Sequence, residues 1–503
     1  MDVLNAIQLG LSSAFQIHNL LYCFIGVFIG TLIGVLPGIG PAGAVAILMP
    51  ATFNIPSVSA IIMLTGIYYG AMYGGSTTSI LVNIPGEAAS VVTCIDGYQM
   101  ARRGRAGPAL GISAFGSFIA GIFGVVGLAV LAPALANIAL GFGPAEYFSL
   151  MTLGMTLLIY LSSGSIIKSL MMAAFGIILG CVGQDPILGH PRLIYGIEAM
   201  REGLDFVPVI MGLFGISEVL INLEKREEKR EIFETKLRGL FPTCDDWKKS
   251  GKPIARGSIL GFLLGILPGG GAVVASFASY AVEKKFSKHP ENFGKGAIEG
   301  VAGPESANNS ATMGAMVPLM TLGIPSNVVM AMLLAALMIH GTPPGPLLIS
   351  NNPELFWGIV VSMFVGNLLL LALNLPLIGI WVQVLRVPYK ILFPLIILFC
   401  LIGAYSVNSR VTDIVIMLLF GYLGYLMKKY EYDGAPLVLA FVLGPMLENA
   451  LRQALIISHG SFRIFINRPI SLTCLSVAVL FLFLPLFPSF KKLRKKIEEE
   501  EEA

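Results

Sequence analysis

The chain has 503 residues, of which 55% are hydrophobic and only 13% charged, and its mean hydropathy is +0.80. This composition excludes an ordinary soluble domain and indicates an all-α polytopic membrane protein. The net charge of +3 says little about partners, but the positions of Lys and Arg are informative because short cytoplasmic loops carry an excess of them. The six cysteines are isolated, so they predict neither a disulfide framework nor a zinc site.

The chain begins without a basic stretch before its first long apolar run, which argues against a cleaved signal. Residues 1–19 therefore predict a short amphipathic, interfacial helix. Segments long enough to cross a bilayer follow, near 57–82, 107–135, 146–164, 167–183, 204–222, 311–339, 355–383, 391–407, 411–427, 435–452 and 470–489. Two more apolar stretches, 20–50 and 257–282, are interrupted in the middle.

The charge pattern divides these segments into regions. Residues 223–257 contain "EKREEKREIFETKLRG" and "DDWKKSGKP", and a run this rich in Lys and Arg predicts a solvated cytoplasmic linker. We therefore predict a first transmembrane repeat at 20–222, a second at 258–452, a terminal transmembrane helix within 453–490 and a charged cytoplasmic tail at 491–503.

The two halves resemble each other in sequence. "GVLPGIG" at 34–40 corresponds to "GILPGGG" at 265–271, an offset of 265 − 34 = 231. "NIPG" around Pro85 corresponds to "GIPS" around Pro325, an offset of 325 − 85 = 240. Further landmarks at Pro108 and Pro346, Pro133 and Pro376, and Glu218 and Glu448 keep the same order. This pattern indicates an internal duplication.

Loop charges predict that the halves have opposite membrane orientation. The loop at 50–56 has no Lys or Arg, whereas its counterpart at 283–296 is basic. Conversely, Arg102, Arg103 and Arg105 lie in a loop whose counterpart at 340–346 has no basic residue. Because basic loops stay in the cytoplasm, this exchange predicts inverted-topology repeats, as in many secondary transporters. Arg192 and Arg201, in an expected outside loop, are exceptions.

The stretch "GILPGGG" has two interpretations. It is either a kink in a spanning helix, with glycines for packing, or the tip of a re-entrant hairpin whose arms are 258–267 and 272–282. Pro268 ends a helix and the glycines permit a tight reversal. The duplicated copy, and basic residues at both ends, favour the hairpin. Gly38, Gly40, Gly269, Gly270 and Gly271 would then expose backbone N–H groups to a carboxylate.

Small polar side chains lie beside a second pair of helix breakers, within 68–90 and 300–327. Broken helices expose amide groups at one end and carbonyl groups at the other, which suits co-transport of an organic anion with a cation. A single Ser or Thr in a membrane helix is more often structural, but the cluster favours function. The predicted substrate-binding side chains are those of Ser76, Thr77, Thr78, Ser79, Asn83, Asn308, Asn309 and Ser310.

Three residues are predicted to take part in cation coupling, namely Glu305, Thr312 and Ser326. Glu305 is the sharpest case because an ionisable group in an apolar region is costly. It either binds a cation or titrates, or it lies at the interface and caps a helix. Glu87 is predicted to lie in the first turn of a helix. Glu218 and Glu448 are predicted to brace the scaffold. The five histidines lack metal-ligand spacing, so no metal site is assigned.

The phrases "GVLPGIGPAGAVAILMP", "YGGSTTSILVNIPGEAASVVTCIDGYQMARRGRAGPAL", "GILPGGG" and "GVAGPESANNSATMGAMVPLMTLGIPS" resemble the large membrane subunit of the tripartite tricarboxylate transporter family, from about residue 20 to 455. This resemblance implies a multi-pass permease in the bacterial inner membrane. It implies two partners, a small membrane subunit and a periplasmic substrate-binding protein. It also implies uptake of citrate-like tricarboxylates, dicarboxylates or aromatic acids, coupled to an ion gradient.

Other classes of function fit the residues less well. No G-x-x-x-x-G-K-[ST] loop for ATP, no H-E-x-x-H and no G-x-S-x-G occurs in the sequence, so we expect no enzyme, no cofactor beyond co-transported Na⁺ or H⁺, and no nucleic-acid partner. An anion channel and a stand-alone carboxylate–cation symporter remain as alternatives. A channel is less favoured because an inverted duplication within one chain suits alternating access.

Overall fold

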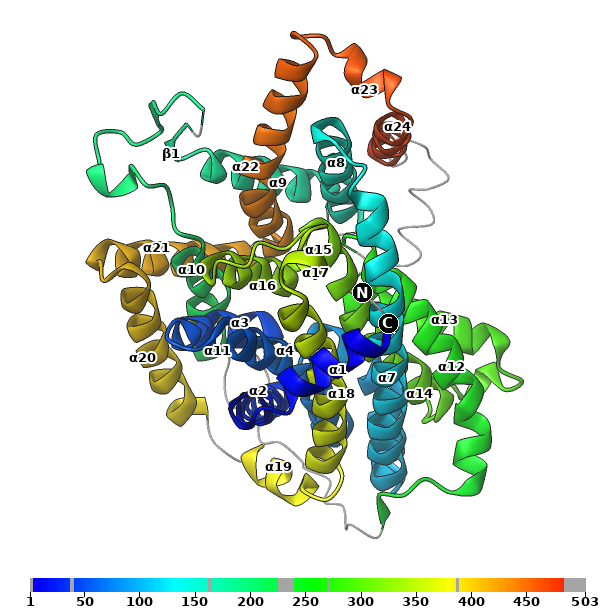
Figure 1. The fold of residues 1–503 in the computed structure, drawn as a ribbon. Coiled ribbons are helices and arrows are strands. Elements are labelled where there is room, and N and C mark those ends of the chain that lie inside the picture. The colour runs from blue at the N-terminus through cyan, green and yellow to red at the C-terminus, as the bar shows by residue number, and fades with distance from the viewer. Residues whose placement is uncertain are drawn as a thin grey trace. The chain divides into compact units, whose positions relative to one another are not determined.

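A computed structural model describes residues 3–36, 40–161, 165–185, 187–224, 239–269, 271–385 and 389–483. Eight helical stretches in this part of the chain are long and apolar enough to cross a membrane. Together with the nearly all-helical architecture in Figure 1, they confirm an all-α polytopic membrane protein. The middle of the predicted linker, at 225–238, and the predicted tail at 491–503 lie outside the described residues.

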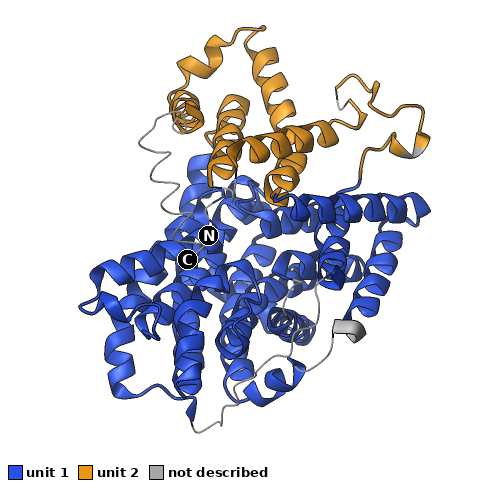
Figure 2. Cartoon of the chain, turned by 180° about the vertical axis from the view of Figure 1, so that it is seen from behind, with its two compact units in different colours: residues 1–140, 205–431 blue, residues 141–204, 432–503 orange. Residues whose placement is uncertain are grey.

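The chain divides into two compact units, coloured in Figure 2. Unit 1 comprises Met1–Leu140 and Asp205–Glu431, and unit 2 comprises Gly141–Leu204 and Tyr432–Ala503. Each half of the sequence contributes helices to both units. The packing units therefore do not coincide with the two predicted repeats.

Unit 1 contains the N-terminal helix, the helices on either side of residues 37–39 and of residue 270, and both interrupted helices. Its first segment comprises α1 (Val3–Ala14), α2 (Ile17–Val35), α3 (Gly40–Leu48), η1 (Met49–Thr52), α4 (Ser57–Val82), η2 (Ala88–Ser90), α5 (Val91–Thr93), the π-helical η3 (Cys94–Tyr98), α6 (Gln99–Arg102) and α7 (Ala106–Ala139). Its second segment begins with α10 (Phe206–Ile210), the π-helical η5 (Met211–Ile216), α11 (Ser217–Glu224), α12 (Cys244–Ile266), α13 (Gly271–Phe286), η7 (Pro290–Asn292) and α14 (Glu299–Gly314). It ends with α15 (Met316–Leu322), α16 (Val328–Ile339), α17 (Leu348–Asn351), α18 (Pro353–Asn374), α19 (Ile378–Val384), α20 (Tyr389–Asn408) and α21 (Val411–Lys429).

Two predicted spans are interrupted. The span predicted at 311–339 is wrong, because α15 ends at Leu322 and α16 begins only at Val328. Gly323 adopts the left-handed conformation that ends helices, with φ +68°, and a proline follows two residues later. The span predicted at 355–383 is also wrong, because the chain breaks between α18 and α19 around Pro376, which has no N–H to donate. By contrast, α4 occupies Ser57–Val82 as predicted.

Glycines bring α2 against α4, and α12 against α14, in backbone contact. Three glycines spaced four residues apart lie on each first helix, and a Cβ added to any of them would stand 2.2–2.5 Å from a carbonyl oxygen of the second helix. They are Gly26, Gly30 and Gly34 against Met63, Ile67 and Ala71, and Gly257, Gly261 and Gly265 against Gly303, Ala307 and Ala311. The residue numbers of corresponding glycines in the two sets differ by 231, for example 261 − 30 = 231. Those of the corresponding carbonyl residues differ by 240, for example 307 − 67 = 240. The same packing thus recurs at the offsets of the sequence repeat.

The chain reverses between α12 and α13. Arg256 on α12 forms an ion pair with the buried Glu283 on α13, with 2.8 Å between Nε and Oε1. These residues are 283 − 256 = 27 positions apart and would lie about 40 Å apart on one continuous helix. A kinked spanning helix is therefore excluded and the hairpin is confirmed. The membrane side of its two ends stays a prediction.

The first arm of this hairpin is longer than predicted. Helix α12 begins at Cys244, inside the segment predicted as a linker, and Thr243 and Asp246 form a capping box at its start. Asp246 also pairs with Arg105, 2.5 Å away. Burial alone would raise the pKa of Asp246, but the hydrogen bonds from Arg105 and Thr243 hold this pKa below its usual value.

Unit 2 consists of α8 (Pro144–Leu161), α9 (Ile166–Gly180), η4 (Glu198–Met200), α22 (Gly434–Ile457), α23 (Arg463–Asn467), α24 (Pro469–Phe483) and two short strands, β1 (Gly183–Gln184) and β2 (Pro191–Arg192). The strands pair antiparallel, with Gly183 opposite Arg192. Helix α9 packs on α22, and α8 packs on α24, where the Ser149 and Ser471 hydroxyl oxygens are 2.6 Å apart. Helix α24 begins at the start of the terminal span predicted at 470–489 and is described to Phe483, and the rest of that span lies outside the described residues.

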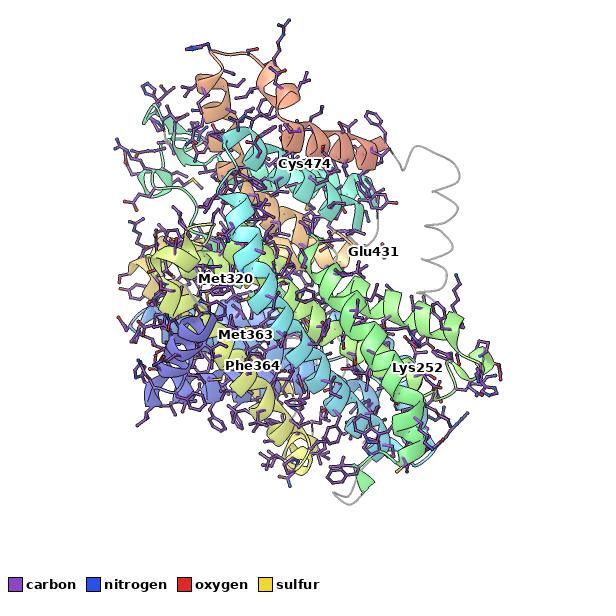
Figure 3. The ribbon with its side chains drawn as sticks, turned by 45° about the vertical axis from the view of Figure 1, so that its right-hand side comes forward. Lys252, Met320, Met363, Phe364, Glu431 and Cys474 are labelled. Carbon is purple, nitrogen blue, oxygen red and sulfur yellow. The ribbon has the colours of Figure 1, made fainter. Side chains whose placement is uncertain are left out.

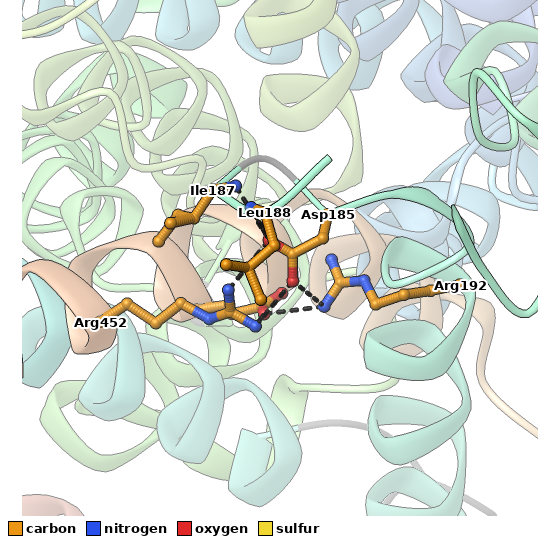
Figure 4. A network of polar contacts seen from close by, with 6 residues as sticks. Asp185, Ile187, Leu188, Arg192 and Arg452 are labelled. Carbon is orange, nitrogen blue, oxygen red and sulfur yellow. Dashed lines mark hydrogen bonds and ion pairs between the residues drawn. The ribbon is translucent and has the colours of Figure 1, made fainter. Parts of the chain in front are cut away.

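A polar network ties the β1–β2 loop to α22 (Figure 4). Asp185 accepts hydrogen bonds from the backbone N–H groups of Ile187 and Leu188 and pairs with Arg452 at 2.9 Å. The Leu188 N–H, the Arg452 side chain and the Ile187 N–H lower the pKa of Asp185. Glu448 pairs with both Arg192 and Arg452. Glu448 therefore braces the scaffold, as predicted, and Glu218 does so in unit 1 by pairing with Lys428.

We predict that Gly261→Ala destabilises the protein by about 3 kcal/mol or more, since the added methyl group meets a backbone carbonyl that cannot move alone. Gly251→Ala is the matched control on the same helix, because nothing lies within 4 Å of its Cβ position. It should leave stability unchanged or raise it by about 0.5–1 kcal/mol. Thermal unfolding of the two purified variants measures the difference. Equal melting temperatures would contradict the close packing of α12 on α14.

We also predict that the ends of the α12–α13 hairpin share one side of the membrane. Lys252 on α12, labelled in Figure 3, and Lys288, just after α13, are both exposed. Lys252→Cys and Lys288→Cys variants should react with a membrane-impermeant maleimide from the same side of oriented vesicles. Labelling from opposite sides would show that the chain crosses the membrane once between these two positions, which would contradict the prediction. Detergent-permeabilised vesicles control for reactivity.

Candidate functional site

The two interrupted helices end in the same way. Asn83 follows α4 and Gly323 follows α15 as C-cap residues, and both have the left-handed conformation, with φ +59° and +68°. Glu87 and Asn327 then cap the next helices, through bonds from the Ala89 and Met330 N–H groups. Both pairs are separated by the repeat offset, 323 − 83 = 240 and 327 − 87 = 240. The breaks are therefore equivalent positions in the two halves.

The halves exchange equivalent contacts at these breaks. The Asn308 amide donates to the Glu87 carboxylate at 3.2 Å, and the Asn327 amide donates to the Tyr68 hydroxyl at 3.3 Å. Asn308 corresponds to Tyr68 (308 − 68 = 240), as Asn327 corresponds to Glu87. Such a reciprocal exchange is typical of a two-fold relation between similar parts. It supports the duplication, and the inverted membrane orientation stays a prediction.

Glu305 lies at the centre of the contact between the halves. It belongs to α14 and is 1% exposed. The Ser76 hydroxyl on α4 donates to its Oε2 at 2.5 Å, the Thr93 hydroxyl on α5 donates to its Oε1, and Ser113 on α7 also hydrogen-bonds its side chain. Among the described residues, no Lys, Arg or His pairs with it. This carboxylate is thus solvated by hydroxyl groups instead of a cation.

The position of Glu305 excludes the interpretation that this residue caps a helix. It lies inside α14, six residues after the helix begins at Glu299, and is buried. It therefore does not cap this helix, whose N-cap residue is Ile298, and its depth in the membrane stays a prediction. Glu87 precedes the first turn of η2 as its N-cap residue, and its side chain accepts from the Ala89 N–H, so the predicted first-turn position is one residue off.

The predicted polar residues are buried, but most lie inside helices instead of at breaks. Helix α14 continues through Asn308, Asn309 and Ser310 to Gly314, so their backbone N–H groups are used within the helix. The expectation that they flank a helix end is wrong. Pro304 lies within this helix, five residues after Glu299, and does not end it, although it has no backbone N–H to donate.

The side-chain contacts of the remaining predicted residues are as follows. Ser76 donates to Glu305, Thr78 to the Val35 carbonyl at the end of α2, and Ser79 to Gly75 within its own helix. Asn309 donates to the Ser117 hydroxyl, Ser310 to the Ser258 carbonyl on α12, and Thr312 to the Asn308 carbonyl. Thr77 faces a small cavity, Ser326 has a buried hydroxyl without a partner, and Asn83 is exposed at the end of α4.

At each glycine tip, a helix begins with a glycine in the left-handed conformation. Gly40 begins α3 and Gly271 begins α13, with φ +63° and +48° and nothing within 4 Å of either Cβ position. The Gly269 N–H donates to the Ser326 carbonyl at 2.9 Å, which joins the α12–α13 tip to the helix break of the same half. Gly38 and Gly270 lie outside the described residues.

Sequence reasoning missed several residues around Glu305, notably Tyr73, Thr93, Ser113, Ser117 and Asn374. Ser113 and Ser117 have the four-residue spacing that places two hydroxyl groups on one face of an apolar helix. Asn374 is an isolated amide at the end of the apolar α18. Both patterns are visible in the sequence. Thr93 gives no such signal, because it reaches Glu305 only through the turn after the α4 break.

A small polar cavity lies beside Ser76. It is lined by Tyr73, Ser76 and Thr77 of α4, Leu110, Ser113 and Ala114 of α7, and Asn374 of α18. The Tyr73 hydroxyl and the Asn374 Oδ1 are buried without a hydrogen-bond partner. Buried polar atoms normally have partners, so the cavity walls present unused oxygen atoms next to the Glu305 site.

Comparisons with known proteins agree with this architecture. A relative from Agrobacterium vitis, an uncharacterized 52.8 kDa protein in the TAR-I ttuC' 3' region, is 50% identical over 502 residues, which cover 100% of both chains. A second, an uncharacterized protein in the TAR-II ttuC' 3' region of the same organism, is 51% identical over 242 residues, covering 48% of this chain and 100% of the relative. No solved structure matches. Residues 20–439 match the model of the tripartite tricarboxylate transporter TctA family, and the chain therefore belongs to this family of transporter membrane components.

Proposed function

We propose that this protein drives uptake of a carboxylate across the bacterial inner membrane with an ion gradient. The observation that carries the proposal is the buried Glu305, held by hydroxyl groups of the other half of the chain and without a basic partner among the described residues. A charge in such a place costs several kcal/mol unless a cation or proton accompanies it. Glu305 therefore couples a bound cation to the state of the contact between the halves.

The substrate is a carboxylate, in agreement with the tricarboxylate transporter family. Helices α3 and α13 start at the two glycine tips, where unpaired N–H groups favour an anion. The open space at Gly40 and Gly271 lets a substrate approach the backbone. The set of carboxylates proposed is citrate-like tricarboxylates, dicarboxylates and aromatic acids.

The proposal includes two protein partners. The tripartite family name supports a system with two further components, which we assign as a small membrane subunit and a periplasmic substrate-binding protein. The binding protein delivers the anion to the outer side of the permease. Movement of the tip-bearing helices then exposes the site to the other side, and the bound cation offsets the charge of the substrate during this step.

Uptake by the reconstituted three-part system tests the proposal. Vesicles containing all three components are given a panel of radiolabelled carboxylic acids under an imposed Na⁺ or H⁺ gradient. We expect accumulation of at least one acid above its external concentration, and only with the gradient present. Flux that equilibrates the acid without accumulation, whatever the gradient, would instead identify an anion channel.

We predict that Glu305→Gln lowers gradient-driven uptake by about tenfold or more, the factor produced by about 1.4 kcal/mol. The amide keeps the shape of the side chain but removes the charge that attracts the cation. Glu299→Gln is the matched control, since it changes a carboxylate in the first turn of the same helix. Normal coupled uptake by Glu305→Gln, at equal abundance in the membrane, would refute the role of this carboxylate.

A further inference from the structure

We infer that the cavity lined by Tyr73, Ser76, Thr77 and Asn374 is a sodium-ion site with Glu305 directly behind it. This inference deepens the proposed function, on which it rests, by locating the coupling ion. It concerns only residues of unit 1, contributed by α4, α7 and α18.

The polar atoms of the cavity are oxygen atoms. Asn374 uses its amide nitrogen to bond the Leu370 carbonyl at 2.9 Å, which leaves Oδ1 buried and without a partner. The Tyr73 hydroxyl oxygen is likewise buried and unpartnered, and its side chain is 3% exposed. The lining also contains the hydroxyl groups of Ser76, Thr77 and Ser113. A set of neutral oxygen atoms without nitrogen or sulfur ligands suits a hard cation.

The hydrogen-bond directions favour a cation over a carboxylate. Ser76 donates its proton to Glu305, so the side of its oxygen that remains can only accept a proton or bind a cation. The free atom of Asn374 is also an acceptor. A carboxylate in the cavity would face these acceptors and the negative charge of Glu305 across one hydroxyl group. We therefore reassign Ser76 and Thr77, predicted from the sequence as substrate ligands, to the cation.

Glu305 supplies the charge that neutral oxygen atoms lack. It contacts the site through Ser76 at 2.5 Å, and Ser113 both lines the cavity and hydrogen-bonds the Glu305 side chain. A sodium ion in the cavity would offset the desolvation of this carboxylate, and the carboxylate would in turn polarise the hydroxyl ligands toward the ion. Because α4 and α14 belong to different halves, occupancy of the site stabilises the contact between them.

The chain offers a matched pair of variants on one helix. Asn367 and Asn374 lie seven residues apart on α18, both are buried, and both donate to the backbone carbonyl four residues earlier. Both also have an unpartnered Oδ1. Only Asn374 lines the cavity, whereas Asn367 packs on Gly121. The substitutions Asn374→Ala and Asn367→Ala thus remove the same groups at and away from the proposed site.

The test is direct binding of Na⁺ to the purified full chain in nanodiscs, which requires neither substrate nor partner proteins. Retention of ²²Na⁺ and thermal stability are measured against NaCl, with choline chloride keeping the ionic strength constant and KCl as a second salt. We expect NaCl to raise the melting temperature of the unmodified chain and of Asn367→Ala with the same half-saturating concentration. Asn374→Ala should need about tenfold more Na⁺ or lose the response, as typical for a lost contact at a metal site.

A second variant keeps the inference testable if Asn374→Ala does not fold, which its melting temperature in choline chloride reports. Tyr73→Phe removes one hydroxyl group and should also raise the half-saturating Na⁺ concentration several-fold. An unchanged Na⁺ response in a folded Asn374→Ala or Tyr73→Phe variant would overturn the site. An equal response of the unmodified chain to Na⁺ and K⁺, or none to either, would overturn the assignment of sodium. Uptake driven by a proton gradient alone, without Na⁺ binding, would do so too while leaving the proposed transport function intact.

Discussion

The backbone contact of α2 with α4, and of α12 with α14, is the constraint on which the rest of the fold depends. It requires glycine at every fourth position, because a single methyl group at Gly30 or Gly261 would overlap a carbonyl oxygen. In an apolar environment, such close approach supplies the dispersion contacts that the hydrophobic effect does not provide between helices. It also lets the hairpin arms shield helices that carry many polar side chains. Without this cover, the fully buried α14, with its Glu, Asn and Ser residues, would be exposed to lipid.

The two repeated halves differ in the positions of their buried charged residues. Equivalent residues end and cap the broken helices of both halves, and the pairs Glu87–Asn308 and Tyr68–Asn327 exchange equivalent contacts. Glu305, however, corresponds to Thr65 (305 − 65 = 240), whose hydroxyl bonds within its own helix. Glu305 therefore has no carboxylate counterpart in the other half. In the proposed mechanism, the two similar halves would allow two ways of packing, and this unmatched charge would distinguish them according to whether a cation is bound.

The sequence predicts the repeat well but its side-chain contacts poorly. Offsets, helix breakers and loop charges are local signals, so α4 and the α12–α13 hairpin could be predicted from them, whereas the functional role of Glu305 stays a prediction. The start of α12 at Cys244 depends on a short capping motif within a segment rich in charged residues. The charge of that segment predicted a linker instead of a helix. Helix α14 continues past Pro304 to Gly314, although a proline usually interrupts a helix. The partners of Glu305, Thr93 and Asn374 are brought together only by tertiary packing, which hydrophobic periodicity does not report.

The hydroxyl groups that hydrogen-bond Glu305 explain why this carboxylate is tolerated without a basic partner among the described residues. Hydrogen bonds to a charged group contribute about 1.5–3 kcal/mol each, which is comparable with the several kcal/mol that burial of the charge costs. The balance is therefore close, and a single bound ion is sufficient to tip it. An arginine or lysine in place of Ser76 would hold the charge permanently and remove this response. In the proposed mechanism, neutral hydroxyl groups from the other half, on α4 and α5, would instead make the contact between the halves depend on what the site contains.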